Sequence, residues 1–174
     1  MKSLKDILYK VEIVSVIGTT DISISTVCFD SRIAEKQSLF IAIKGTQTDG
    51  NRFVEEVIKS GAIAIVSEQK PVVTIEGVNY IIVKNAAKAL AVIAANFYNN
   101  PSEKIKLVAV TGTNGKTTVA TLLYNMYHSM GKKVGLLSTI VNKIGDIEVP
   151  SNYTTPDALS LNKLLSEMLA HGCQ

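Results

Sequence analysis

Residues 111–118 read Thr-Gly-Thr-Asn-Gly-Lys-Thr-Thr and directly follow the apolar run Ile-Lys-Leu-Val-Ala-Val at 105–110. A buried-strand pattern that runs into a glycine-rich turn ending in Gly-Lys-Thr is the layout of a phosphate-binding loop. Glycine lets the backbone fold around phosphate oxygens where a Cβ atom would clash. The N–H groups of such a turn form an anion nest, and the positive end of the following helix points to the same place. The stretch therefore predicts a nucleoside triphosphate site.

The residue types in this loop predict its contacts. Lys116 would reach the terminal phosphates, and the Thr117 hydroxyl would ligate Mg²⁺, so a nucleoside triphosphate and Mg²⁺ are the expected cofactors. The residues expected to contact the nucleotide are Gly112, Thr113, Asn114, Gly115, Lys116, Thr117 and Thr118. The common, longer loop has a glycine at the position that Val110 occupies here, so the chain carries only the shorter pattern with Gly112 and Gly115. The plain alternative, a turn with a surface lysine, is disfavoured because strand, loop and helix follow in the right order.

The segments after the loop fit a βαβ unit. Apolar residues recur three and four apart from Lys116 to about Met130, which predicts a helix with Val119, Leu122, Leu123 and Met126 on its packed face. Gly131 is a good helix stop, and residues 132–138 supply the next strand. The loop would then lie at the carboxyl end of the first of two parallel strands.

Length and composition limit the class of protein. The chain has 174 residues, 47% hydrophobic and 19% charged, which fits one ordinary globular domain or two small ones. A net charge of +3 with scattered lysines does not argue for nucleic acid, and no apolar run reaches a membrane-spanning length. The N-terminus does not read as a secretory signal. Cys28 and Cys173 lack metal-binding spacing, so we expect free thiols in a reducing cytoplasm.

Strand and helix patterns alternate along the chain, which predicts an α/β fold. The expected strands are 22–29, 38–44, 62–67 and 80–84, and a short helix opens the chain. Asn51 is expected to cap a helix that ends at Gly61, and Asn85 to cap a long helix that ends near Tyr98.

The end of the long helix marks the expected domain boundary, with residues 1–95 as one domain and 96–174 as the beginning of a second. In the second, Gly145-Asp146 predicts a hairpin within 139–150, and Asp157 opens a final helix. Two parallel strands are too few for a buried parallel sheet. We therefore expect the chain to be a fragment of a longer protein.

Three motifs in order resemble the Mur ligase family. The first is Phe29-Asp30-Ser31-Arg32 with Ser-Leu-Phe-Ile-Ala-Ile-Lys-Gly at 38–45 and Asp49-Gly50; the second is the loop 111–118; the third is Asn-Tyr-Thr-Thr-Pro-Asp at 152–157. The resemblance covers the whole chain but about the N-terminal third of such an enzyme. Within the family the Thr-Thr-Pro block favours the MurE type over the MurF type.

The resemblance implies a small N-terminal α/β domain that binds the uridine diphosphate of the substrate, followed by an incomplete central ATP-binding domain. It implies an ATP-dependent amide ligase of peptidoglycan synthesis, which adds a diamino acid (meso-diaminopimelate or L-lysine) to UDP-N-acetylmuramoyl-L-alanyl-D-glutamate through an acyl phosphate. By motif position the substrate-binding residues would be Phe29, Ser31, Thr46, Gln47, Thr48, Asn152, Thr154 and Thr155. The full-length enzyme is expected to be a monomer without nucleic acid or membrane partners, and the chain alone to be inactive.

Other readings of the same residues stay open. Asp30 and Arg32 could form a structural ion pair that fixes a turn, and Thr-Thr-Pro-Asp could simply start a helix. A MurF-type ligase, a folylpolyglutamate synthase-like ligase and a non-catalytic module that binds UDP-sugars are the competing functions. A generic P-loop kinase is disfavoured by Val110.

Overall fold

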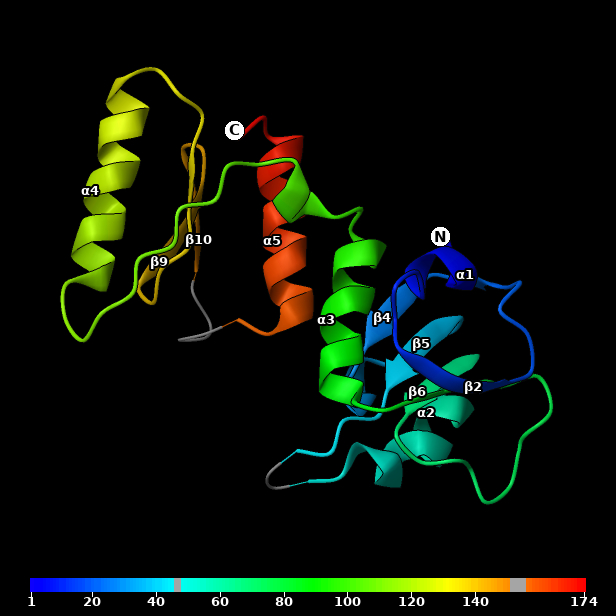
Figure 1. Cartoon of the computed structure of the whole chain (residues 1–174). Coiled ribbons are helices and arrows are strands. Elements are labelled where there is room, and N and C mark those ends of the chain that lie inside the picture. The colour runs from blue at the N-terminus through cyan, green and yellow to red at the C-terminus, as the bar shows by residue number, and fades with distance from the viewer. Residues whose placement is uncertain (46–47, 151–155) are drawn as a thin grey trace. The chain divides into compact units, whose positions relative to one another are not determined.

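The computed structural model describes residues 1–45, 48–150 and 156–174. The chain divides into two compact units, Met1–Phe97 and Tyr98–Gln174. Both mix helices with strands, so the predicted α/β class is confirmed (Figure 1). No helix among the described residues is both long and apolar enough to span a membrane.

A five-stranded sheet forms the centre of the first unit, with the strand order β2-β7-β6-β5-β4. Its strands are β2 (Ile13–Ile17), β4 (Thr26–Cys28), β5 (Ser38–Ile41), β6 (Ala64–Ser67) and β7 (Asn79–Val83). Strands β4 to β7 are parallel, and β2 pairs antiparallel with β7 at one edge. A separate two-stranded pair joins β1 (Lys2–Ser3) to β3 (Ser23–Ile24).

Helices cover both faces of this sheet (Figure 1). They are α1 (Leu4–Ile7), α2 (Val54–Lys59) and α3 (Ala86–Phe97), with 3₁₀ turns η1 (Ser31–Ile33) and η2 (Gly50–Phe53). Val57 of α2 packs with Phe40 and Ile65 in one fully buried cluster. Leu39 and Ile41 alternate with Phe40, so they point to the opposite face, where α1 and α3 lie. Burial on both faces explains why these strands read as continuous apolar runs.

Three expectations for this unit need correction. The opening helix is shorter than expected, Leu4–Ile7, and strand β2 was not anticipated. The expected strand 22–29 is divided into β3 and β4, with Ser25 bonded to the 36–37 segment between them. Asp49, not Asn51, provides the cap at the start of η2.

The second unit holds a three-stranded antiparallel sheet in the order β10-β9-β8. Its elements are η3 (Pro101–Glu103), α4 (Lys116–Ser129), β8 (Gly135–Leu136), β9 (Val141–Ile144), β10 (Ile147–Pro150) and α5 (Ala158–Ala170). The hairpin with Gly145-Asp146 at its turn is confirmed, as is the start of α5 at Asp157, whose carboxylate accepts from the N–H groups of Leu159 and Ser160. Leu165 and Met168 of α5 pack against Ile144 to form its core.

The expected parallel strand pair before and after α4 is wrong. Residues 105–110 are not a strand, and only Gly135–Leu136 of the expected strand 132–138 forms one. The physical reason is strand pairing. Strand β8 is hydrogen-bonded to β9, and no described strand is hydrogen-bonded to residues 105–110, so this apolar segment forms no part of a sheet. The expected packed face of α4 is also largely exposed, since Val119, Leu122 and Met126 are 44%, 61% and 46% accessible, while Leu123 is half-buried.

Candidate functional site

The loop at residues 111–118 leads directly into α4, which begins at Lys116. Gly112 and Gly115 have φ values of +153° and +78°, a region that residues with a Cβ rarely adopt. The backbone can therefore turn sharply, and the unpaired N–H groups of the first helical turn lie next to the loop. This is the arrangement in which a helix N-terminus attracts an anion.

The space beside the two glycines is open. A Cβ built on Gly115 would meet no heavy atom within 4 Å, and one built on Gly112 would meet only the Asn114 carbonyl oxygen, at 3.6 Å. The protein therefore leaves this side of the turn open. Thr113, Asn114 and Thr118 are exposed around the same loop.

Two side chains next to the loop, Lys116 and Thr117, come from the first two residues of α4. Lys116 Nζ donates to the carbonyl oxygens of Gly112 and Thr113 at 2.7 and 3.3 Å, so the ammonium group lies against the turn. The half-buried Thr117 hydroxyl lies 3.5 Å from the Thr139 hydroxyl. Among the described residues no group of three or more His, Cys, Asp or Glu side chains could hold a metal ion. A cation here would rely on a hydroxyl such as that of Thr117, together with the oxygens of its nucleotide.

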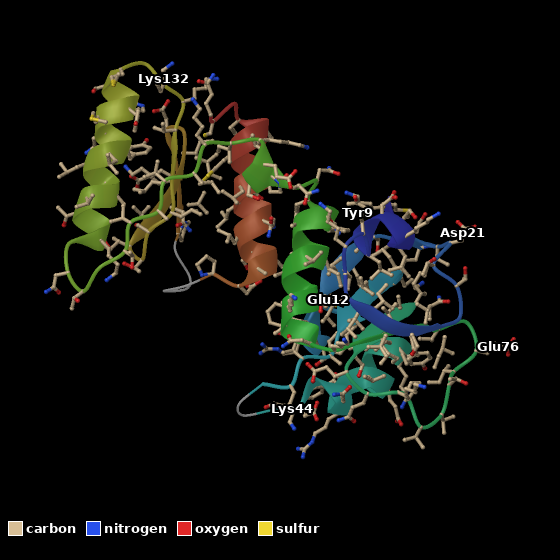
Figure 2. All side chains as sticks on the ribbon, viewed as in Figure 1. Tyr9, Glu12, Asp21, Lys44, Glu76 and Lys132 are labelled. Carbon is tan, nitrogen blue, oxygen red and sulfur yellow. The ribbon has the colours of Figure 1, made fainter. Side chains whose placement is uncertain are left out.

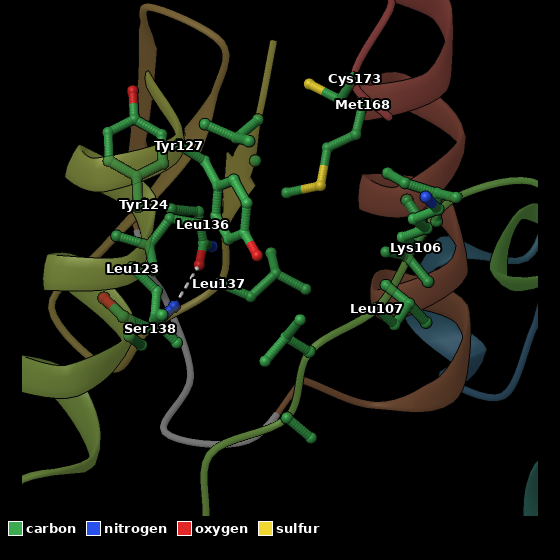
Figure 3. Close-up of a pocket in the computed structure, with 18 of the residues that line it drawn as sticks. Lys106, Leu107, Leu123, Tyr124, Tyr127, Leu136, Leu137, Ser138, Met168 and Cys173 are labelled. Carbon is green, nitrogen blue, oxygen red and sulfur yellow. Dashed lines mark hydrogen bonds between the residues drawn. The ribbon is translucent and has the colours of Figure 1, made fainter. Parts of the chain in front are cut away.

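A cavity of about 1050 Å³ lies beside the loop within the second unit (Figure 3). Its walls are the 105–110 segment, the inner side of α4, strand β8 and the side chains of Leu165 and Met168. Lys116 and Thr117 line it as well, so the loop and the cavity are continuous. The residues expected to form a buried strand thus line an open space instead.

A second candidate surface lies at the carboxyl edge of the five-stranded sheet, where open α/β sheets bind their ligands. Phe29 directly follows β4, Ser31 begins η1, and Thr48 belongs to the turn after β5. Phe29 and Thr48 are exposed and Ser31 is half-buried, so all three can meet a ligand. The other expected substrate-binding residues (Thr46, Gln47, Asn152, Thr154 and Thr155) lie outside the described residues.

Asp30 and Arg32 form the ion pair that was one of the two readings of this motif. The Arg32 Nη2 and Asp30 Oδ2 atoms lie 2.5 Å apart, and the Arg32 N–H also donates to Asp30. These bonds lower the pKa of the Asp30 carboxyl. The pair closes the turn that carries Ser31, as the structural interpretation predicts.

Sequence reasoning missed a polar network next to Thr48. Asp49, Asn51 and Ser67 are linked by hydrogen bonds, although Ser67 lies 16 residues from Asn51. No spacing signal could have found Ser67, because its partner is brought near only by the pairing of β5 with β6.

Comparison with known families gives two matches. The model described as "Mur ligase family, catalytic domain" matches residues 23–98, and the "Mur ligase middle domain" model matches residues 110–174. Each matched range includes the residues of one of the two candidate surfaces.

Individual proteins are similar over nearly the whole chain. A protein of Cytophaga hutchinsonii named UDP-N-acetylmuramoyl-L-alanyl-D-glutamate–2,6-diaminopimelate ligase is 52% identical over 98% of this chain, which spans 35% of that protein's length. A solved structure carrying the same enzyme name matches with a TM-score of 0.76 at 24% identity, over 99% of this chain and 34% of the other, and so supports the fold. The ADP complex of MurF ligase from Thermotoga maritima matches with a TM-score of 0.53 at 26% identity, over 80% and 28%.

Proposed function

Since the chain belongs to the Mur ligase family, we propose that it supplies the uridine-nucleotide-binding unit and the ATP loop of an ATP-dependent amide ligase. The reaction would add 2,6-diaminopimelate to UDP-N-acetylmuramoyl-L-alanyl-D-glutamate in peptidoglycan synthesis. The name of the relative that is 52% identical favours diaminopimelate over L-lysine and the MurE type over the MurF type.

The observation that carries the proposal is the open glycine turn at the start of α4. Gly112 and Gly115 leave room for phosphate, and Lys116 lies at the rim with its ammonium group on the turn. The match to an ADP complex supports ATP as the nucleotide. Lys116 would exchange its two carbonyl partners for phosphate oxygens, which bind an ammonium group more strongly because they are charged.

The chemistry expected at this loop is acyl phosphate formation. The D-glutamyl carboxylate attacks the γ-phosphorus of ATP, ADP leaves, and the amine of diaminopimelate then displaces phosphate to form the amide. Such phosphoryl transfer depends on positioning and on charge neutralisation. Lys116 would neutralise phosphate charge, and the Thr117 hydroxyl would hold Mg²⁺, which screens the charge of the phosphates when bound.

The first unit would bind the substrate's uridine diphosphate at the carboxyl edge of its sheet. Phe29 would offer an apolar face to the uracil ring, while Ser31 and Thr48 would offer hydroxyl groups. Thr46, Gln47, Asn152, Thr154 and Thr155 belong to the same proposal through their motif positions. A cytoplasmic location is also part of it, because ATP and nucleotide-linked sugars are available there; the free thiols of Cys28 and Cys173 agree with a reducing compartment.

Calorimetric titration of the 174-residue chain with UDP-N-acetylmuramoyl-L-alanyl-D-glutamate, and separately with Mg·ATP, tests the proposal. We expect heat of binding with the UDP-sugar and weaker or absent binding of ATP, because the chain spans about a third of the length of the relatives that it matches. Clear ATP binding without any UDP-sugar binding would overturn the ligase assignment and leave a general phosphate-loop protein.

We further predict that the 174-residue chain does not complete the ligation by itself. The chain spans about a third of the length of the relatives it matches, and none of its described side chains is assigned to binding the incoming amino acid. Phosphate release would be measured with the UDP-sugar, diaminopimelate and Mg·ATP present together. Phosphate release above that of a Lys116→Met variant would contradict this prediction.

A further inference from the structure

The turn between β5 and η2 is tied to the sheet at both of its ends. The parallel pairing continues past β5, since the Ala42 N–H donates to the Val66 carbonyl oxygen at 2.8 Å. Gly50 N–H then donates back to the Ile43 carbonyl oxygen at 2.9 Å, which brings the end of the turn onto its own beginning. Lys44, labelled in Figure 2, forms an antiparallel bridge with Asp49 where the two ends of the turn meet, which we call the neck of the turn.

Gly50 shows how closely the two ends approach. A Cβ on Gly50 would lie 2.8 Å from both the nitrogen and the oxygen of Ile43, and 3.1 Å from the Cα of Ala42. These are backbone atoms of the two residues that directly follow β5, and the Ala42 N–H is bonded to β6, so little movement is open to them. The return path of the turn is therefore fixed by direct backbone packing.

A line of side-chain hydrogen bonds connects this turn to the central strand. Asp49 Oδ1 accepts from the backbone N–H and from the Nδ2 of Asn51 at 2.9 and 2.7 Å. Asn51 Oδ1 accepts from the Ser67 hydroxyl at 2.7 Å. A carboxylate can only accept, so the amide of Asn51 must present its NH₂ group to Asp49 and its oxygen to Ser67.

Ser67 is the fixed end of this network. It is the last residue of β6, the middle strand of the sheet, and is 5% exposed. Its oxygen also accepts from the Gln69 N–H at 3.0 Å, so the hydroxyl both donates and accepts a hydrogen bond. A buried hydroxyl with this many partners holds one orientation.

We propose that Asn51 and Ser67 are positioning residues that hold Asp49, and with it Thr48, in the geometry that binds the uridine diphosphate of the substrate. The inference rests on the proposed function of the first unit. In this role the two side chains would act on the nucleotide through Asp49 and the neck of the turn. Thr48 is exposed, and its carbonyl oxygen accepts from the Gly45 N–H at 2.9 Å within the same turn.

Calorimetry with UDP-N-acetylmuramoyl-L-alanyl-D-glutamate and thermal unfolding, measured on the same samples, separate positioning from plain stability. We expect Ser67→Ala and Asn51→Ala each to weaken binding about 3- to 10-fold, the range for losing one buried hydrogen bond. Ser67→Thr keeps the hydroxyl and should retain an affinity close to that of the wild-type chain.

Ser60→Ala is the matched control. Its hydroxyl bonds only to the Glu56 carbonyl oxygen at 3.2 Å, it is exposed at the end of α2, and the substitution removes the same atom. Its affinity for the UDP-sugar should equal that of the wild-type chain.

The outcomes are distinct. A wild-type chain that does not bind the UDP-sugar contradicts the proposed function itself. Wild-type binding with unchanged affinity in Ser67→Ala and Asn51→Ala overturns the positioning role alone. Equal weakening in Ser60→Ala also overturns it, because the effect would then follow general destabilisation.

Discussion

At the scale of single residues, Cys28 shows how burial sets chemistry. It ends β4, is fully buried and packs with Phe40 and Ala42 in the core of the first unit. Burial disfavours the thiolate and raises the pKa of the thiol to about 11. Since the thiolate is the nucleophile, Cys28 is an inert packing residue in the folded protein.

The raised pKa of Cys28 predicts a loss of stability in alkali. The unfolded chain releases this proton near pH 9 and the folded chain near pH 11, so the free energy of unfolding falls between these values. The expected loss is roughly 2 kcal/mol by pH 11. Urea denaturation across this pH range would measure it. Cys28→Ala removes this contribution, and parallel profiles for the two proteins would refute the prediction.

At the scale of elements, Asn96 joins two helices of the first unit. It lies on α3, is 7% exposed, and its Nδ2 donates to the carbonyl oxygens of Ile7 and Tyr9 at 2.9 and 2.6 Å. These carbonyls lie at the end of α1, a helix too short to be stable by itself. One amide side chain thus satisfies the open end of α1 and attaches it to α3.

Replacing this amide should loosen α1. We expect Asn96→Ala to lower the free energy of unfolding by about 1–3 kcal/mol, because it leaves two carbonyl groups without their partner. Lys88→Ala on the same helix is the control: its ion pair with Glu12 is exposed, and losing it should cost less than about 1 kcal/mol. Chemical denaturation measures the free energy of unfolding of both variants. An equal decrease in the two would contradict the proposed role of Asn96.

At the scale of the whole molecule, the two units differ in how completely they are packed. The first buries both faces of a five-stranded sheet, while the second contains the cavity of about 1050 Å³ and an α4 with exposed apolar residues. Unfilled space removes contacts from the side chains that line it. The second unit should therefore be the less stable one.

Calorimetric unfolding should show this difference. We expect two transitions for the 174-residue chain, with the one at higher temperature reproduced by residues 1–97 alone. Adding the UDP-sugar should raise only that transition, because a ligand stabilises the unit that binds it. A single transition that the ligand shifts as a whole would show instead that the units unfold together.

Much of the local structure could be read from neighbouring residues. The start of α4 after Gly115 and the caps at Asn85 and Asp157 all appear where the sequence predicts them. Each depends on hydrogen bonds or backbone angles within a few residues. Asp49 was missed as a cap because Asn51, two positions later, is an equally good cap residue by type.

The sequence by itself determined the α/β class, the glycine turn at residues 111–115 and the helix that follows it, because these follow from local periodicity and from residues that permit a turn. Only the tertiary structure decided which strands pair. Residues 105–110 have the pattern of a strand but no described partner, whereas Ile13–Ile17 forms an edge strand because β7 offers one. The bond between Asn51 and Ser67 likewise exists only because β5 and β6 lie side by side. Strand pairing and such contacts join residues far apart in the chain, and no local pattern encodes which partner will be present.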